Sequence, residues 1–275
     1  MSNDRYLNQT FNLKGRVAIV TGGVGQLGTQ YVKSLLAVGV KVAVFDITIN
    51  KLNDFYIAKK SDKNLLLCKV DITQKESIDN GLKSVIKKYG IPSILINNAA
   101  LDSSPDASLD NNCPFEVYPE KLLDQIYAVN LKGAILCCQV IGKIMAENKG
   151  GSIINISSLY GNVSPDQRMY EYRKRGNKKF CKPVSYAVTK AAIINLSRYL
   201  ATYWAEKNVR VNTLSLGGVF NNQDKKFLEE YSKRVPIGRM ARKDEYNGAI
   251  LFLASDASSY MTGSNVIIDG GFTAW

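Results

Sequence analysis

The sequence predicts an α/β fold built on a parallel sheet, on the basis of two observations. Short runs of aliphatic and β-branched residues alternate along the chain with longer segments of helical periodicity, as in βαβ units. Some of these runs, such as Ile94-Leu95-Ile96, are continuously apolar, as expected of strands that are buried on both faces of a sheet. At 275 residues, 45% of them hydrophobic, the chain is long enough for one sizeable core, so we expect one domain over residues 1–275.

The apolar runs predict seven strands, at residues 16–21, 40–45, 65–70, 94–100, 151–158, 209–214 and 266–268. Between them we expect helices at 73–89, 121–148 and 185–207, and one that ends near Val38. Residues 101–120, with three prolines and many Asp, Asn and Ser residues, are predicted to be a loop that forms a wall of the active site. Residues 159–182 have no sustained period and are also predicted to be irregular.

Composition narrows the possible functions. The chain carries a formal charge of +12 and no histidine, which excludes histidine-based catalysis and disfavours zinc ligation. Its five cysteines have no metal-binding spacing, so we expect free thiols and no metal site. The basic residues are mostly scattered, so an anionic small molecule is a better candidate partner than nucleic acid. No apolar run is long enough to suggest a membrane span, and we expect a soluble cytoplasmic protein.

A glycine-rich turn follows the first predicted strand and opens the first helix. Such a turn lets the backbone approach a pyrophosphate, while the helix N-terminus offers N–H groups to the anion. Asp46 ends the second strand, where its carboxylate would accept the adenosine-ribose hydroxyls and repel a 2′-phosphate. No Arg or Lys lies in 22–28 or directly after Asp46, so NAD is favoured over NADP. Asp71 and Ile72 end the third strand and are candidates for the adenine edge. The turn's candidate cofactor-binding residues are Gly22, Gly25, Gln26, Leu27 and Gly28.

A Tyr-x-x-x-Lys pair at the start of a helix places a phenol and an ammonium one turn apart, and the cation can stabilise a phenolate. Four pairs have this spacing: Tyr56/Lys60, Tyr170/Lys174, Tyr186/Lys190 and Tyr203/Lys207. Tyr186 opens a segment with an apolar face that could pack on the sheet. The residues after Tyr170 are polar and basic and lack such a face. We therefore favour Tyr186 and Lys190.

Together these features resemble the short-chain dehydrogenase/reductase family over nearly the whole chain. The resemblance implies a single-domain Rossmann fold with a seven-stranded doubly wound sheet, a bound nicotinamide dinucleotide, and interconversion of a secondary alcohol and a ketone. The features that carry it are the turn at 21–28, Asp46, Asp71-Ile72, residues 97–100, Asn130, Ser157-Ser158, Tyr186 with Lys190, and the closing segments 253–256, 262–263 and 269–271.

By position, the resemblance also implies roles for individual residues. Ser158 would bind the substrate oxygen and Tyr186 would transfer the proton. Lys190 would hold the nicotinamide ribose and lower the phenol pKa, and Asn130 would seat a relay water. The further cofactor-binding positions that it implies are Asn98 and the backbone of Val219.

Three features depart from the family pattern. Gln26 stands where the single-domain branch usually has glycine, as in the extended branch that modifies sugar nucleotides. Leu216-Gly217 replaces the usual Pro-Gly after the sixth strand, which could loosen the wall under the nicotinamide. Ser158 and Tyr186 are 28 residues apart, about fifteen more than the family norm, so residues 159–182 form an insertion. Tyr170 lies nearer the usual separation and is the rival for the catalytic position.

The insertion bears on the substrate. Its basic residues suit phosphate or carboxylate recognition, so a phosphorylated or nucleotide-linked sugar is one candidate, and a solvated basic loop or subunit contact is another. These residues are Arg168, Arg173, Lys174, Arg175, Lys178, Lys179 and Lys182. The sequence of residues 157–166 and 271–275 resembles that of a subgroup of the family assigned to flagellin or surface-glycan sugar modification. Alternatives are a 3-oxoacyl-carrier-protein reductase and a non-catalytic dinucleotide-binding protein.

Assembly is predicted from two helices that look apolar on more than one side, at 121–148 and 185–207. The second carries Tyr199, Tyr203 and Trp204 beside Leu200, more apolar surface than one sheet face would cover. We expect a homotetramer first and a homodimer second, in line with the family resemblance.

Overall fold

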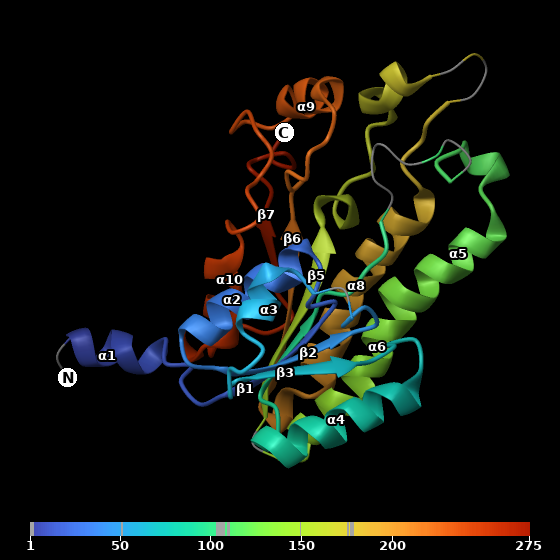
Figure 1. Cartoon of the computed structure of the whole chain (residues 1–275). Helices are drawn as coiled ribbons and strands as arrows, with labels where there is room; N and C mark the ends of the chain where they lie inside the picture. Colours follow the sequence, from blue (N-terminus) through green and yellow to red (C-terminus); the bar gives the residue numbers. More distant parts are fainter. Residues whose placement is uncertain are drawn as a thin grey trace.

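A computed structural model describes residues 3–50, 52–102, 108, 111–148, 150–174, 176 and 179–275. Seven parallel strands form one sheet of order β3-β2-β1-β4-β5-β6-β7, which confirms the predicted doubly wound α/β class (Figure 1). The strands are β1 (Val17–Thr21), β2 (Lys41–Asp46), β3 (Leu65–Lys69), β4 (Ile94–Asn97), β5 (Gly151–Ser158), β6 (Val209–Leu216) and β7 (Asn265–Ile268). Every predicted strand is present, and most bounds agree within one or two residues.

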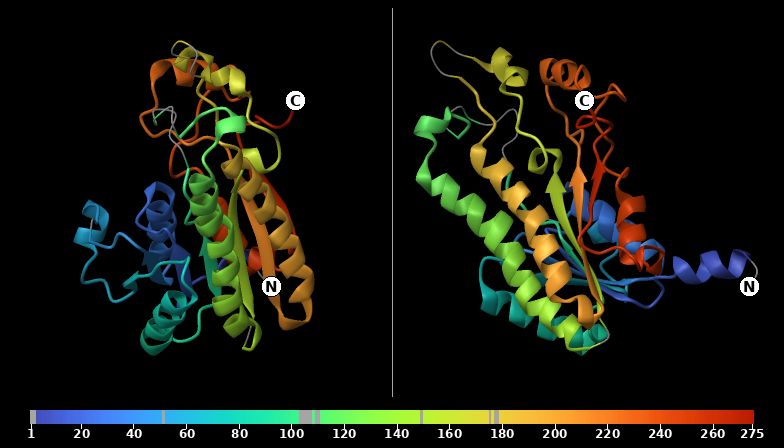
Figure 2. Two further views of the ribbon diagram at one scale, coloured as in Figure 1. Left: turned by 90° about the vertical axis from the view of Figure 1, so that its right-hand side faces the viewer. Right: turned by 180° about the vertical axis from the view of Figure 1, so that it is seen from behind.

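Helices cover both faces of this sheet, because successive strand residues point to opposite sides (Figure 2). Ala18 and Val20 of β1 pack in a core with α2 (Gln26–Ala37), α3 (Asp54–Ala58) and α10 (Asn247–Ala254). Val17 and Ile19 face the other core, under three further helical segments. Those segments are α4 (Lys75–Tyr89), the long helix that begins at Glu120, and α8 (Val184–Tyr203).

The long helix is continuous from Glu120 to Ala146, close to the predicted 121–148. It consists of α5 (Glu120–Tyr127), α6 (Ala134–Cys137) and α7 (Lys143–Ala146), joined by π-helical segments Ala128–Gly133 and Cys138–Gly142. By length and composition alone it could cross a membrane, but half of its apolar window is buried inside the protein. Cys137 and Cys138 belong to the core beneath it, so it is a core helix of this fold.

A third apolar cluster stands above the carboxyl ends of β5 and β6, apart from the two cores (Figure 1). It joins α9 (Lys225–Ser232) to a 3₁₀ helix, Gln167–Arg173, inside the insertion. The insertion, predicted to be irregular, thus contains a short helix, and α9 is a helix that was not predicted from the sequence. The remaining elements are α1 (Asn3–Thr10) and short 3₁₀ turns at Phe115–Val117, Leu159–Gly161, Ala205–Lys207 and Asp256–Ser258.

Leu216 extends β6 instead of loosening the wall beside it. The residue is buried and pairs in register with Ile268 of β7. The next residue continues the ladder, since the Gly217 N–H donates to the Ile268 carbonyl at 2.8 Å. The departure from Pro-Gly therefore leaves this strand end well paired.

The apolar surplus predicted on α8 is smaller than expected. Trp204 and Leu200 are both 8% exposed. The Trp204 ring is covered because it packs where Gly142 leaves room on the neighbouring helix. Tyr199 and Tyr203 are 61% and 67% exposed, and their rings stack at 5.9 Å. The prediction for Trp204 is thus wrong, while the two tyrosines remain a candidate contact surface.

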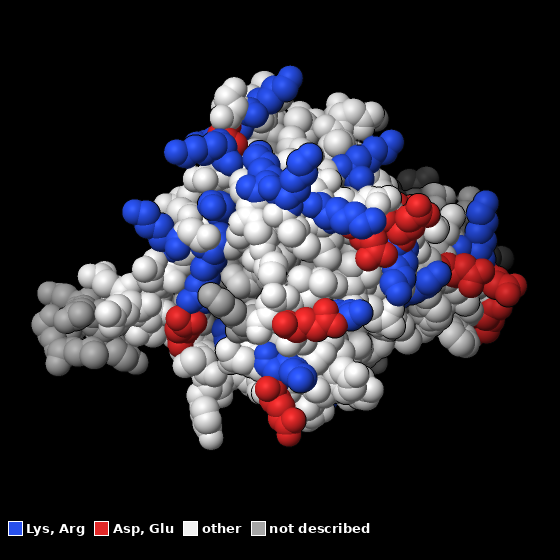
Figure 3. All heavy atoms as spheres, turned by 90° about the horizontal axis from the view of Figure 1, so that it is seen from below, with Lys and Arg blue, Asp and Glu red and all other residues white. Residues whose placement is uncertain are grey.

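Charge is spread over the surface. On the face in Figure 3, Lys and Arg side chains lie in several groups with Asp and Glu side chains between them. Several basic residues are also neutralised locally, among them Arg239 by Glu245 at 2.7 Å. This distribution gives no single basic stripe on that face of the kind that tracks a nucleic-acid backbone.

Candidate active site

The glycine turn brings β1 and α2 close together. Gly22 has φ +61°, a left-handed conformation that favours glycine. A Cβ on Gly28 would lie 2.2 Å from the Gly22 carbonyl oxygen, so the turn and the helix can approach this closely only with glycine at 28. The helix N-cap, Gly25, makes no side-chain cap, which leaves the first backbone N–H groups to face an anion.

Asp46 lies directly beside this turn. Its Oδ2 accepts from the Val24 N–H at 3.1 Å, and its Oδ1 accepts from the Thr48 N–H and hydroxyl at 3.0 and 2.7 Å. The carboxylate is therefore fixed in orientation at the end of β2. It borders the same cleft as Gly22 and Gly28.

Asn98 connects the ends of two neighbouring strands. Its side-chain amide donates to the carbonyls of Thr21 and Gly22, both at 3.0 Å, while its backbone N–H donates to the Thr21 hydroxyl. Asp71 accepts from the N–H and hydroxyl of Thr73, which shapes the turn after β3. Both residues hold strand ends that border the cleft.

Gln26 reaches across the cleft mouth. Its Nε2 donates to the Phe220 carbonyl at 2.8 Å, so the glycine turn is joined to the segment after β6. That segment is anchored in turn, since the Phe220 N–H donates to the Ala241 carbonyl at 2.9 Å and Val219 bridges Ala241. The glycine usual at position 26 could not make this link.

These elements surround one cleft of about 720 Å³ at the carboxyl edge of the sheet. Such an edge is where ligands bind in open α/β sheets. All the predicted site residues except Asn130 line it: Gly22, Gly25, Gln26, Leu27, Gly28, Asp46, Asp71, Ile72, Asn98, Ser158, Tyr186, Lys190 and Val219. Among the described residues, no group of three or more His, Cys, Asp or Glu side chains could hold a metal ion.

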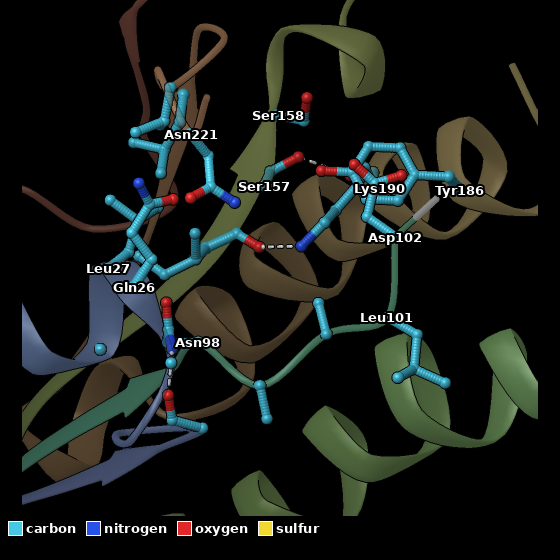
Figure 4. Close-up of a pocket in the computed structure, with 18 of the residues that line it drawn as sticks. Gln26, Leu27, Asn98, Leu101, Asp102, Ser157, Ser158, Tyr186, Lys190 and Asn221 are labelled. Atoms are coloured by element: carbon cyan, nitrogen blue, oxygen red, sulfur yellow. Dashed lines mark hydrogen bonds between the residues drawn. The ribbon is translucent and has the colours of Figure 1, made fainter. Parts of the chain in front are cut away.

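Tyr186 and Lys190 enter the cleft from the first two turns of α8 (Figure 4). The Lys190 Nζ lies 5.7 Å from the Tyr186 ring centroid and donates to the Ile156 carbonyl at 2.9 Å. Burial lowers the pKa of the Lys190 ammonium to about 8, so it is still mostly charged at neutral pH. Burial also raises the pKa of the Tyr186 phenol, as does the nearby negative charge of Asp102.

Ser158 ends β5 next to this pair. Its side chain hydrogen-bonds Tyr186, which lowers the phenol pKa and opposes the effect of burial. Its Oγ also accepts from the Tyr160 N–H at 3.2 Å. The preceding residue, Ser157, donates to the Lys190 carbonyl at 2.7 Å and so fixes α8 against β5.

Asn130 lies behind the cleft. Its Oδ1 accepts from the Leu101 N–H at 2.7 Å and its Nδ2 donates to the Leu101 carbonyl at 2.9 Å. The residue belongs to a π-helical segment, a feature often found at functional sites. In this structure Asn130 fixes the backbone after β4, the segment that leads to Asp102.

The rival tyrosine, Tyr170, has a different environment. It is 2% exposed and stacks on Phe180 at 5.1 Å and Phe227 at 5.7 Å, within the third apolar cluster. It reaches the cleft wall, but its partner by spacing, Lys174, is not among the cleft-lining residues. Lys190 gives Tyr186 the cation that Tyr170 lacks from its own pair.

The other two candidate pairs lie away from the cleft. Tyr56 is fully buried and donates to the Gly23 carbonyl at 2.6 Å, a contact that supports the glycine turn from outside. Tyr203 is an exposed surface residue. The structure thus places only Tyr186, of the four candidates, in the cleft with its own lysine.

Two charged residues that line the cleft were not predicted as site residues. Asp102 follows β4, and its Oδ1 lies 2.5 Å from the Nζ of Lys182. That ammonium lies 4.7 Å from the Tyr186 ring centroid and is almost fully buried. The sequence offered only weak signals, since Asp102 sat in an irregular loop and Lys182 was one of seven basic residues.

The basic insertion therefore does not act as one surface. Lys182 points inward, whereas Arg168 is exposed and paired with Asp166 at 2.8 Å. Arg173 lies over the Phe180 ring at 5.1 Å. Arg175 and Lys178 lie outside the described residues.

The chain is similar to known proteins over nearly its whole length. A family model described as short chain dehydrogenase matches residues 16–184, and one described as enoyl-(acyl carrier protein) reductase matches residues 177–273. An NAD-dependent glycerol dehydrogenase of Listeria innocua is 32% identical, with 97% of each chain covered. An NADH-dependent L-xylulose reductase of Ambrosiozyma monospora is 31% identical, covering 97% of this chain and 98% of the relative.

A solved structure gives the same result. A short-chain dehydrogenase of Leptospira borgpetersenii with bound NAD+ has a TM-score of 0.83 and 34% identity, covering 95% of this chain and 94% of its own. These relatives support a nicotinamide dinucleotide as the cofactor. With the family model matching more than half of its length, the chain belongs to the short-chain dehydrogenase family.

Proposed function

We propose that this chain is an NAD-dependent oxidoreductase that interconverts a secondary alcohol and a ketone in a small polyol or sugar, with Tyr186 as the acid/base. The observation that carries the proposal is the set of buried Ser158, half-buried Tyr186 and buried Lys190 in one cleft with the glycine turn and Asp46. Relatives over nearly the whole chain act on glycerol and L-xylulose by name, which favours a polyhydroxylated substrate.

In the oxidising direction the Tyr186 oxygen accepts the proton of the substrate hydroxyl, and in the reducing direction it returns that proton to the new alkoxide. Ser158 is placed to hydrogen-bond the same substrate oxygen, because its hydroxyl already bonds the phenol. Lys190 lies close enough to stabilise the phenolate by its charge. The nicotinamide, when bound, supplies the hydride acceptor or donor.

The preference for NAD rests on Asp46. Its carboxylate borders the cleft, where it can accept two ribose hydroxyls and repel a 2′-phosphate. Ile47 and Thr48 follow it, and neither supplies a cation to neutralise such a phosphate.

Asn130 would support the site in two ways. It fixes the backbone of Leu101 beside the cleft, and it would hold a relay water.

A second candidate is a 3-oxoacyl-carrier-protein reductase, the activity for which a relative of Thermotoga maritima is named that is 31% identical over 94% of this chain. A phosphorylated, nucleotide-linked or glycan-derived sugar is the third class to be tested. A dinucleotide-binding protein without turnover is opposed by the complete set of Asn130, Ser158, Tyr186 and Lys190.

We also propose a cytoplasmic homotetramer, or failing that a homodimer, formed by one domain over residues 1–275 with the insertion at 159–182. The exposed and stacked Tyr199 and Tyr203 on α8 favour a contact there between copies. Five free cysteines suit a reducing compartment. Light scattering at micromolar concentration tests the assembly, and a stable, active monomer would contradict it.

The function is tested by following the absorbance of NADH or NADPH, which rises when an alcohol is oxidised and falls when a ketone is reduced. Glycerol, D-arabinitol, xylitol, a sugar phosphate and a nucleotide sugar are supplied with NAD, and an acetoacetyl thioester with NADH and NADPH. We expect turnover of at least one polyol. Turnover of the thioester alone would favour the carrier-protein reductase, and tight NADH binding without turnover on the whole panel would favour the non-catalytic protein.

A further inference from the structure

An ion pair lies directly over the proposed catalytic phenol. Lys182 comes from the insertion and Asp102 from the segment after β4, and the two meet at 2.5 Å. The Lys182 Nζ is 4.7 Å from the Tyr186 ring centroid. Figure 4 shows Asp102 beside Tyr186 at the same cavity. The pair therefore stands where the part of a substrate next to the reacting carbon would lie.

Both partners are held by their backbones. Asn130 bonds the N–H and the carbonyl of Leu101, the residue before Asp102. Gln167 does the same for Lys182, accepting from its N–H at 2.8 Å and donating to its carbonyl at 3.3 Å. The Cys181 N–H, next to Lys182, donates to the carbonyl of Asn112, ten residues after Asp102, at 2.7 Å. Such fixed geometry is expected of a recognition element.

The two side chains differ in access to the cleft. The Lys182 side chain is 7% exposed, whereas that of Asp102 is 44% exposed, and both line the cleft. An ionised carboxylate has about four lone-pair sites. Asp102 can thus accept from Lys182 and from substrate hydroxyls at the same time. Lys182 acts as its fixed counter-ion from the protein side.

The charge of Asp102 is a cost to the chemistry unless it has another use. A carboxylate near a phenol disfavours the phenolate, and Asp102 raises the pKa of Tyr186. The Lys182 ammonium, which pairs with Asp102, lies 4.7 Å from the centroid of the same ring. A carboxylate with a buried counter-ion is consistent with a hydrogen-bonding role that a neutral apolar residue could not perform.

The same wall carries further hydroxyl groups. Tyr160 and Tyr170 line the cleft, their side chains hydrogen-bond each other, and the charge of Asp102 acts on both. A site built to bond hydroxyls discriminates strongly against an analogue that lacks them, because its polar groups are then left unpaired. This chemistry matches a substrate with more than one hydroxyl.

We propose that Asp102, held by Lys182, binds the hydroxyl on the carbon next to the reacting carbinol and so selects polyols over monohydric alcohols. This inference rests on the proposed function. It assigns Asp102 as a specificity-determining residue and Lys182 as a positioning residue for it. Neither assignment depends on which polyol is the natural substrate, since adjacent hydroxyls are common to the class.

The test compares butane-2,3-diol with butan-2-ol, two substrates that differ only in the neighbouring hydroxyl. We expect wild-type kcat/KM with NAD to be higher for the diol. Asp102→Asn should lower kcat/KM for the diol by about 10- to 100-fold and leave butan-2-ol nearly unchanged, so that the preference disappears. Asp102→Ala should have at least the same effect. Glu171→Gln removes an exposed carboxylate from the insertion that carries Lys182. It is the matched control and should keep the preference for the diol.

A second readout distinguishes recognition from a loss of folding. The charged and titratable groups that face Tyr186 are Lys190 on its own helix, Lys182 and Tyr160 of the insertion, and Asp102 after β4. The rate of diol oxidation rises with pH as the Tyr186 phenolate forms. The pH midpoint of this rise should be lower than that of the wild type in Asp102→Asn and higher in Lys182→Gln. NADH affinity, measured by fluorescence titration, should stay unchanged in both.

The outcomes separate the two hypotheses. If wild type oxidises neither butane-2,3-diol nor any polyol of the panel, the proposed function fails. If it does so, and Asp102→Asn keeps the wild-type preference for the diol over butan-2-ol, the recognition role is wrong while the function stands. Should Asp102→Asn lose NADH binding as well, Lys182→Gln decides, since an unchanged preference and an unmoved pH midpoint in that variant overturn the inference.

Discussion

The cleft has two sides that are built differently: a nucleotide side at the glycine turn, Asp46 and Asn98, where we propose that the cofactor binds, and a substrate side at Asp102 and the insertion, where we propose that the substrate binds. The nucleotide side uses consecutive strand ends and their turns, in which contacts such as Asp46 to Val24 join neighbouring elements of one sheet. The substrate side uses contacts between distant segments, among them Asp102 with Lys182 and Tyr172 with Asp224. Its apolar cluster is separate from the two cores that cover the sheet.

This difference implies that the two sides can be altered independently. The nucleotide side inherits its rigidity from a sheet buried on both faces, so its geometry follows from the fold itself. The substrate side depends on an inserted segment held by α9 and by ion pairs, so it can change without disturbing the sheet. Variants on each side should therefore affect cofactor affinity and substrate kinetics separately.

The largest expected effect is at the boundary of the two sides. Tyr186→Phe should lower kcat by about 10²- to 10⁴-fold, the usual contribution of general acid–base catalysis, because the proton acceptor is removed. NADH affinity should persist, since the nucleotide side is untouched. Steady-state rates and fluorescence titration measure the two quantities. Tyr170→Phe is the control, and a comparable loss there with an active Tyr186→Phe would move the assignment to Tyr170.

Lys190 should show a cost in stability that accompanies its role. Its pKa is about 8 when folded against 10.5 for the ordinary group, so the unfolded chain holds more protons between these values. Stability from this group therefore rises with pH across that window and is lowest below pH 8. Lys190→Met should raise the free energy of unfolding by up to about 3 kcal/mol at pH 7 and remove turnover. Urea titrations at pH 7 and 10 measure both points, and a gain independent of pH would contradict this cause.

The sequence predicted the two sides of the cleft unequally. The glycine turn and Asp46 were predictable because a short-range motif places them at the ends of adjacent parallel strands, and Asn98 followed from the family resemblance. Asp102 was not, because its partner Lys182 is 80 residues away and only the folded insertion brings them together. Tyr170 was a plausible rival by spacing until its packing on Phe180 was known.

The same reasoning explains the errors in the fold. All seven strands were predicted because each is a short segment rich in aliphatic and β-branched residues. The 3₁₀ helix at Gln167–Arg173 and α9 depend on each other's apolar residues, so neither shows a strong local signal. Trp204 was expected on the surface because the sequence could not show that Gly142 leaves space for its ring.

Cofactor choice tests the nucleotide side alone. Asp46→Ala removes the carboxylate that would oppose a 2′-phosphate, so the ratio of NADPH to NADH dissociation constants should fall by about tenfold or more. Kinetics of the substrate side with saturating cofactor should change little. Fluorescence titration with both nucleotides measures the ratio. Tighter binding of NADPH than NADH by the wild type would contradict the assigned role.

The ion pairs of the insertion test the substrate side. Asp166 holds Arg234 at 2.8 Å, which joins the insertion to the end of α9, and the Arg168 and Arg234 guanidiniums keep its carboxyl pKa below the usual range. Asp166→Asn should raise KM for the polyol about threefold to tenfold, with NADH affinity unchanged. Asp256→Asn is the matched control, because it breaks an ion pair with Arg16, which lies before β1 at the edge of the sheet opposite the cleft. A loss of NADH affinity in Asp166→Asn would show that the two sides are coupled.

The smallest expected effect is at the hydrogen bond that Gln26 makes across the cleft mouth. Gln26 donates to the Phe220 carbonyl, and a partly exposed hydrogen bond contributes about 0.5–1.5 kcal/mol. Gln26→Gly removes it and restores the residue usual in the single-domain branch. NADH should then dissociate about twofold to tenfold faster, and kcat should rise if cofactor release limits turnover. Stopped-flow displacement of NADH measures the rate, with Gln223→Ala as a control that breaks a bond within the same segment, to the Val219 carbonyl. An unchanged dissociation rate in Gln26→Gly would mean that the link does not restrain the cofactor.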